Sequence, residues 1–162
     1  DIYPALEKGT IDAAEWVGPY DDEKLGFNKV APYYYYPGWW EGGADLEFFI
    51  NNKKYEALSA ENKAILQAAC AVAAQDMTAK YGAQNPPALK RLVGGGTKLT
   101  LFPKAVMDAG WKATQEVCAA HSAKSPEFKK IYDDMRNFQR DQILWNRFSE
   151  YPFNQYMNTL KI

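Results

Sequence analysis

Apolar residues recur at helical spacing along most of the chain after residue 58. The pattern predicts helices over residues 59–82 and 85–94, and two more that open at Pro103 and at Ser125-Pro126-Glu127. The last helix would run for about 25 residues, or roughly 37 Å at 1.5 Å per residue, until Pro152. Its apolar residues wrap more than one face, which predicts that it lies across two domains or against a second subunit.

Three shorter runs predict strands. Residues 11–16 form an apolar run that ends in Glu15 and Trp16, residues 46–50 resume an alternating pattern, and residues 97–102 alternate at period two. The first run is interpreted as a short buried strand whose end brings Glu15 and Trp16 to a cleft. The order strand, strand, helix, helix, strand, helix, helix predicts an α/β domain with crossover connections.

Glycine and proline mark the turns between these runs. Gly9 fits the left-handed position just past a helix end, and residues 21–26 predict one exposed helical turn. Prolines exclude a regular helix from residues 28–36, which are extended and aromatic. The arginines lie on predicted helices and indicate solvated or interface faces rather than a carboxylate clamp: Arg91, Arg136, Arg140 and Arg147.

The composition is that of a globular protein. With 162 residues, 47% of them hydrophobic and 24% charged, the chain can form one domain with a sizeable core and is not disordered. A net charge of −1 gives no indication of an electrostatic nucleic-acid footprint. No apolar stretch approaches the roughly 20 residues that span a bilayer. Because the chain starts at Asp1 rather than Met, on the tail of a predicted helix, we expect a C-terminal piece of a longer protein, with any export signal on the preceding part.

Cysteine and histidine usage adds little chemistry. Cys70 and Cys118 both lie in predicted helices, where a disulfide and two buried free thiols are both compatible with the sequence. The single histidine, His121, lies near a helix end and is expected to compensate the helix dipole. No Cys–His or Ser–His motif supports nucleophilic catalysis.

Aromatic residues, which make up 15% of the chain, gather around two acids. Trp16 follows Glu15, and an aromatic turn rich in glycine contains Tyr33, Tyr34, Tyr35, Tyr36, Trp39, Trp40 and Glu41. Carboxylates from Glu15 and Glu41, with a main-chain carbonyl beside Trp16, would suit a hard ion such as Na⁺ or Ca²⁺. The nearby glycines would let the backbone come close to such an ion.

Other interpretations of these residues stay open. Each acid can be a solvent-exposed loop residue. The two acids can also flank a sugar bond, as in a carbohydrate-active hydrolase that uses Glu15 and Glu41 and stacks pyranose rings on the neighbouring tryptophans. A third interpretation is a dimerisation module built on the long last helix, with no ligand at all.

A family resemblance begins at residues 3–16, where a helix end is followed by Leu-x-x-Gly-x-Ile-Asp-Ala-x-Glu. This segment resembles the solute-binding subunit of tripartite ATP-independent periplasmic (TRAP) transporters. The likeness continues through residues 33–41, 46–66 and 125–148, and so covers essentially the whole chain. Glu15-Trp16 and the tyrosine and tryptophan turn resemble the branch that binds 2-oxo monocarboxylates such as pyruvate, or related hydroxy acids.

The resemblance implies a periplasmic-binding-protein-like (type II) α/β fold with a long C-terminal helix. The chain would be the C-terminal part of a two-lobed receptor, with a hinge segment at about residues 10–45, a C-terminal lobe and long helix at 46–162, and the N-terminal half missing. Such a receptor is not an enzyme: it closes on a small carboxylate in the periplasm and delivers it to the TRAP membrane subunits. The last helix resembles one that exchanges between subunits of a homodimer.

The resemblance also implies roles for individual residues. Glu15 matches a metal-ligating acid, Trp16 matches the neighbour that gives a main-chain carbonyl, and Glu41 matches a second acid. Trp39, Trp40 and Tyr35 would contact the substrate together with Glu15 and Trp16. The family's substrate-clamping arginine and a metal-binding glutamine belong to the preceding half, so this chain alone is not expected to close around a ligand. An anionic ligand beside two glutamates would be repelled without a cation, which agrees with the implied metal.

Overall fold

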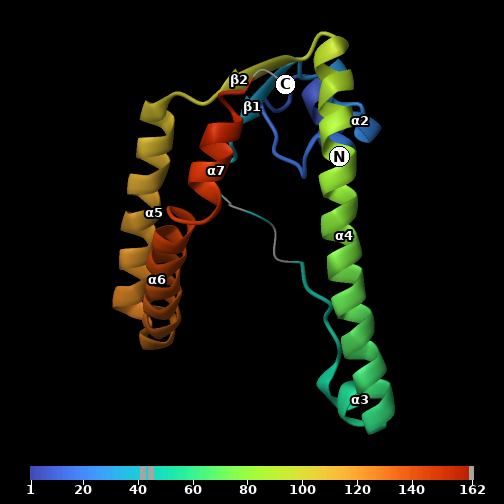
Figure 1. Cartoon of the computed structure of the whole chain (residues 1–162), viewed down its shortest axis with the longest axis vertical. Helices are drawn as coiled ribbons and strands as arrows, with labels where there is room; N and C mark the ends of the chain where they lie inside the picture. The colour runs from blue at the N-terminus through green and yellow to red at the C-terminus, as the bar shows by residue number, and fades with distance from the viewer. Residues whose placement is uncertain (41–42, 44–45, 161–162) are drawn as a thin grey trace. The chain divides into compact units, whose positions relative to one another are not determined.

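The computed structural model describes residues 1–40, 43 and 46–160, which divide into two compact units, Asp1–Pro103 and Lys104–Ile162 (Figure 1). The first unit contains α1 (Ile2–Glu7), α2 (Pro19–Leu25), η1 (Phe27–Lys29), β1 (Tyr33–Tyr36), α3 (Asn52–Glu56), α4 (Ala60–Gly94) and β2 (Lys98–Leu101). The second unit contains α5 (Lys104–Lys124), α6 (Pro126–Asn146) and α7 (Glu150–Met157). Within the described ranges, no helix has both the length and the apolar character of a membrane span.

A parallel pair of strands organises the first unit. Tyr33 of β1 lies opposite Lys98 of β2, and Tyr36 lies opposite Leu101. The backbone N–H of Phe102 extends the ladder by donating to the Tyr36 carbonyl at 2.8 Å. Parallel strands need a long crossover, and here α3 and α4 lie between them in the chain. The predicted strand at residues 97–102 and the predicted crossover are therefore confirmed.

Glycines in the left-handed conformation follow the two short helices α1 and α2. Gly9 follows α1 with φ 66°, and Gly26 ends α2 in the left-handed conformation with φ 72°, as the sequence predicts. Proline occupies the first position of α2, where its missing N–H is not needed, and Asp21 and Asp22 lie in the favourable first turn. The predicted helical turn at residues 21–26 therefore forms and begins slightly earlier, but the prediction that it is exposed is wrong for Asp22, which is buried.

One long helix replaces the two that the sequence predicts between residues 59 and 94. α4 runs unbroken for 35 residues and contains Pro86 and Pro87. A proline inside a helix removes one backbone hydrogen bond and crowds the preceding turn. Here α2 packs on the same part of α4, and Ala88 and Leu92, which follow the prolines, are buried. Tertiary packing thus offsets the local penalty, and the prediction of two helices is wrong.

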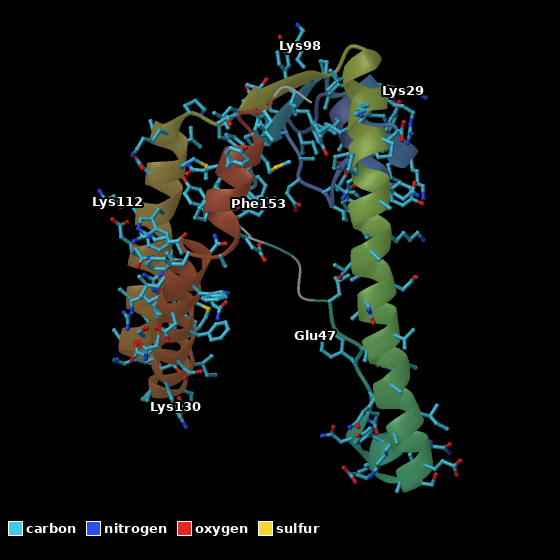
Figure 2. All side chains as sticks on the ribbon, viewed as in Figure 1. Lys29, Glu47, Lys98, Lys112, Lys130 and Phe153 are labelled. Carbon is cyan, nitrogen blue, oxygen red and sulfur yellow. The ribbon has the colours of Figure 1, made fainter. Side chains whose placement is uncertain are left out.

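Two predicted strands do not form. Residues 11–16 contain no strand, and Glu15 is exposed. Residues 46–50 are also without regular structure, and Phe48 and Phe49 remain 71% and 84% exposed; Glu47 of this segment is labelled in Figure 2. A strand is stable only when a neighbour satisfies its backbone groups. In the described part of the chain the sheet consists of β1 and β2, so neither segment has a partner strand.

The second unit is built on the packed pair α5 and α6. Ser125 separates the two helices and caps α6, because its Oγ accepts from the Phe128 N–H at 3.1 Å. His121 lies in the last turn of α5, as predicted, and its ring lies 5.5 Å from that of Phe128.

The last helix ends earlier than the sequence predicts. α6 has 21 residues and stops at Asn146, and Pro152 lies in the first turn of α7 instead of ending α6. A proline is tolerated there because the first N–H groups of a helix are unbonded. The Ser149 Oγ donates to the Trp145 carbonyl at 3.0 Å where the chain leaves the helix. Phe153, labelled in Figure 2, lies on α7.

Candidate functional site

A pocket of about 90 Å³ lies within the first unit. Its walls come from α1, the segment before α2, α2, η1, β1, the end of α4 and the residue just before β2. Glu15 and Trp16 both line it, together with Asp22, Asn28 and Tyr34. The structure thus brings the first predicted pair of site residues into a cavity that also holds an unpredicted acid.

Glu15 and Trp16 reach this pocket without forming a strand. Both are exposed, Trp16 at 46%, and the Trp16 ring meets the edge of Phe27 at 6.1 Å. The segment is placed because Gly18, two residues later, is the N-cap of α2. The position of α2 therefore fixes where the acid and the indole ring lie.

The remaining predicted aromatic residues form a cluster of their own. The Tyr35 ring lies 5.0 Å from that of Phe102, the Trp40 ring lies 6.3 Å from Phe102, and the Trp39 and Trp40 rings meet edge to face at 5.2 Å. All three predicted residues are more than two-fifths exposed and do not line the pocket. Glu41 lies outside the described residues.

Asp22 is the site residue that the sequence does not reveal. Only 7% of it is exposed, the Tyr34 hydroxyl donates a hydrogen bond to its Oδ2, and its Oδ1 is buried without a partner. Burial raises the pKa of Asp22, and the nearby charges of Asp21 and Glu15 add to this, whereas the Tyr34 hydroxyl and the Gly18 N–H act in the opposite direction. Burial, and then the bond to Asp22, raise the pKa of the Tyr34 hydroxyl.

No sequence signal marks this burial. The residues Asp21-Asp22-Glu23-Lys24 have the composition of a solvated helical turn, and aspartate is seldom buried unless it is paired. The partner, Tyr34, is one of four consecutive tyrosines, and alternation alone predicts that about two of them pack inward. The pair becomes visible only when α2 and β1 are placed in space.

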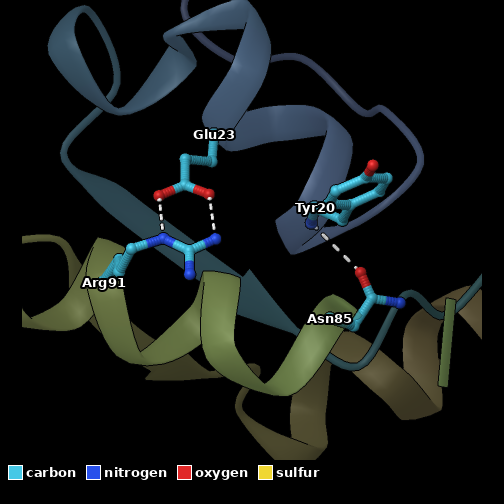
Figure 3. Close-up of polar contacts among 4 residues, drawn as sticks. All are labelled: Tyr20, Glu23, Asn85 and Arg91. Atoms are coloured by element: carbon cyan, nitrogen blue, oxygen red, sulfur yellow. Dashed lines mark hydrogen bonds and ion pairs between the residues drawn. The ribbon is translucent and has the colours of Figure 1, made fainter. Parts of the chain in front are cut away.

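Two polar contacts fix α2 on α4 (Figure 3). The Asn85 Oδ1 accepts from the Tyr20 N–H at 3.0 Å, and the Arg91 Nε and Nη2 donate to the two Glu23 carboxylate oxygens at 2.7 Å each. Arg91 is exposed, as the sequence predicts, and the carboxylate that it binds belongs to its own chain. The bond from Arg91 lowers the pKa of Glu23, and Glu23 raises the pKa of Arg91.

Carboxylate oxygens, which line the pocket, are the type of ligand that a hard cation prefers, but they are too few to complete its coordination. Across residues 1–40, 43 and 46–160, no three His, Cys, Asp or Glu side chains gather closely enough to hold a metal ion. Ca²⁺ takes 6–8 oxygen ligands, whereas this pocket is lined by the carboxylates of Glu15 and Asp22. Cys70 is exposed, Cys118 is half-buried, and both are free, so they form no disulfide and the expectation of two buried thiols fails for Cys70.

The pocket lies beside the first residues of the parallel strand pair, because Tyr33 and Tyr34 of β1 and Thr97, which precedes β2, line it. Residues 1–125 match the family of bacterial extracellular solute-binding proteins, family 7 (DctP), and the chain belongs to this family. It is 41% identical over 159 residues to a monocarboxylate 2-oxoacid-binding periplasmic protein of Nostoc sp., covering 98% of this chain and 44% of that protein.

A crystal structure is also similar over nearly the whole chain. It is of a TRAP transporter solute-binding protein from Bordetella bronchiseptica RB50, with a TM-score of 0.91 and 52% identity over 97% of this chain and 47% of that one. That protein is a mixed-occupancy dimer with copurified calcium and picolinate in one active site and an apo site in the other.

These comparisons confirm several predictions from the sequence. The resemblance to TRAP solute-binding subunits, the periplasmic-binding-protein-like α/β fold and the extracytoplasmic location all follow from the family. The family is one of binding proteins rather than enzymes, so the hydrolase alternative with Glu15 and Glu41 is not supported. The chain spans less than half the length of the Nostoc and Bordetella relatives, at 44% and 47%.

Proposed function

We propose that the whole protein is a periplasmic receptor that binds a small monocarboxylate together with a metal ion and delivers it to the membrane subunits of a TRAP transporter. The ligand is a 2-oxo acid such as pyruvate, or a related 2-hydroxy acid. The observation that carries the proposal is that Glu15 and Trp16 line one pocket of a family 7 solute-binding protein. The Nostoc and Bordetella relatives, named for 2-oxoacid binding and for bound calcium and picolinate, support the ligand class.

The metal is Na⁺ or Ca²⁺, ligated by the Glu15 carboxylate, the Trp16 main-chain carbonyl and Glu41. A bound cation supplies the positive charge that lets an anionic ligand approach an acidic pocket. The exposed rings of Trp16, Trp39, Trp40 and Tyr35 supply apolar surface against the ligand. Rings that exclude water also strengthen the remaining polar contacts.

The chain supplies part of the binding site. The pocket of about 90 Å³ is smaller than the roughly 300–1,000 Å³ of small-molecule sites. In this proposal residues 10–45 form a hinge segment, residues 46–162 form the C-terminal lobe with its long helix, and a further lobe completes the cleft. The coverage of 44% and 47% of the relatives supports this arrangement, because it leaves room for a second lobe of similar size.

The protein forms a homodimer through α6. Three of its apolar residues follow one another at intervals of seven and are exposed: Ile131 at 71%, Phe138 at 65% and Trp145 at 66%. A seven-residue repeat places side chains along one stripe of a helix, as in helix–helix packing between chains. The dimeric state of the Bordetella relative supports the same proposal.

Calorimetric titration tests the function in the full-length protein. Pyruvate is titrated into metal-free protein, and then into protein with Ca²⁺ or with Na⁺. We expect saturable binding with at least one of the ions and much weaker binding without either. Absence of pyruvate, lactate and picolinate binding under every metal condition would overturn the proposed ligand class.

A further inference from the structure

The predicted site residues lie on two segments that are far apart along the chain. Glu15 and Trp16 lie just before α2, whereas Tyr35 lies on β1 and Trp39 and Trp40 lie after it. In the described part of the chain, one side-chain hydrogen bond joins α2 to β1, namely the bond from the Tyr34 hydroxyl to the Asp22 carboxylate. This bond therefore links the two segments through α2, which follows Glu15 and Trp16, and β1, which contains Tyr35.

The bond is built into the wall of the pocket. Asp22 and Tyr34 line the same cavity as Glu15 and Trp16, and Asp22 is 7% exposed. The second oxygen of Asp22, Oδ1, is buried without a partner, so within the described residues Tyr34 is the one side chain that donates a hydrogen bond to this carboxylate. Loss of the Tyr34 hydroxyl would leave a buried acid unsatisfied, which is costly.

Covalent and packing contacts connect the Asp22–Tyr34 pair to both groups of predicted site residues, the Glu15–Trp16 segment and the aromatic cluster. On one side, the Trp16 ring packs on Phe27, which follows α2 directly after Gly26. On the other side, Tyr34 precedes Tyr35, whose ring packs on Phe102, and Phe102 also meets the Trp40 ring. A shift of α2 relative to β1 would therefore change the spacing between the indole of Trp16 and the aromatic cluster.

We propose that Asp22 and Tyr34 are positioning residues of the carboxylate site, whose hydrogen bond sets the distance between the Glu15–Trp16 segment and the aromatic cluster after β1. This inference rests on the proposed function. Neither residue needs to touch the ligand, because the pair acts through the segments that it joins. Removal of the Tyr34 hydroxyl should then weaken carboxylate binding by more than the accompanying loss of global stability explains.

The same helix offers a matched control. Glu23 and Arg91 join α2 to α4 at 2.7 Å, and neither lines the pocket. Their side chains are 28% and 55% exposed, so the pair is a surface contact of modest strength. Glu23→Gln weakens the attachment of α2 as a purely structural change, whereas Tyr34→Phe weakens its attachment to the aromatic segment.

The test measures pyruvate binding by calorimetry in the full-length protein with saturating Ca²⁺, with picolinate as a second probe, beside the melting temperature of each variant. We expect Tyr34→Phe and Asp22→Ala to weaken pyruvate binding by about tenfold. Asp22→Asn retains an oxygen acceptor for the hydroxyl and should recover much of the loss. Glu23→Gln should change the affinity by less than about threefold.

Two results would overturn the inference, and they are distinct from failure of the function. The first is unchanged pyruvate affinity in both Tyr34→Phe and Asp22→Ala. The second is a loss of affinity that follows the melting temperature equally in Tyr34→Phe and Glu23→Gln, because that would be a general effect of loosening α2. If the wild-type protein binds neither probe, the proposed function itself is overturned, and the inference with it.

Discussion

The guanidinium of Arg91 meets the carboxylate of Glu23 through two hydrogen bonds of 2.7 Å, across 68 positions of sequence. Two parallel bonds between planar groups fix orientation as well as distance. The pair therefore attaches α2 to the last part of α4, at a place outside the pocket.

Because Arg91 lowers the pKa of Glu23, the ion pair stabilises the fold at neutral pH. The contribution is present above the ordinary pKa of 4.5 and is lost as the pH falls through the lower folded value. We expect Glu23→Gln to lower the melting temperature at pH 7 by about 1–4 °C, an effect reduced by salt. Thermal unfolding at two pH values measures this, and an equal loss in strong acid would contradict it.

Burial raises the pKa of Asp22 above its ordinary value of 3.8, so the folded protein holds this proton more tightly than the unfolded chain. Ionisation of Asp22 therefore reduces stability as the pH rises through the folded pKa. Asp22→Asn removes the charge and keeps an acceptor for Tyr34. We expect the variant to gain stability relative to wild type between about pH 4 and pH 7. Urea unfolding across that range tests this, and a constant difference between the two proteins would refute it.

Much of the fold can be predicted from local chemistry. Gly9 and Gly26 occupy left-handed positions after helices, Ser125 caps α6, and the alternating residues 97–102 contain β2. In each case the signal is contained in a few neighbouring residues. The predictions hold because no contact with a distant part of the chain competes with this local signal.

The errors arise where distant contacts decide the outcome. Residues 11–16 are apolar enough for a strand, but the described sheet supplies no partner for them. Pro86 and Pro87 predict the start of a new helix, yet α4 continues past both prolines because packing against α2 stabilises it there. The site was partly predictable for the same reason. Glu15 and Trp16 share a local motif, whereas the burial of Asp22 depends on β1.

Glu15→Gln tests the proposed metal ligand without a large change of shape. A neutral amide binds a hard cation less strongly than a carboxylate, so metal-dependent pyruvate affinity should fall by about tenfold or more. Asp12→Asn is the matched control, because Asp12 is exposed in the same segment and does not line the pocket. Equal affinity in wild type and Glu15→Gln, measured by calorimetry with Ca²⁺, would remove Glu15 from the site.

A charge in the apolar stripe of α6 should separate the proposed dimer. Phe138→Asp places an acid at a position that is 65% exposed in this chain, and burying it between subunits would be unfavourable. The control is Arg140→Gln, about 200° away around the helix at 3.6 residues per turn. Light scattering should give a monomer for Phe138→Asp and a dimer for the control. Dimers from both variants would place the interface elsewhere.

The most direct test of the central claim is a crystal structure of the full-length protein with calcium and pyruvate or picolinate. We predict that the anomalous signal of calcium lies about 2.3–2.6 Å from the Glu15 carboxylate and the Trp16 carbonyl, with the ligand carboxylate bound to the same ion. Calcium and ligand bound together at a place that Glu15 and Trp16 do not reach would contradict the account.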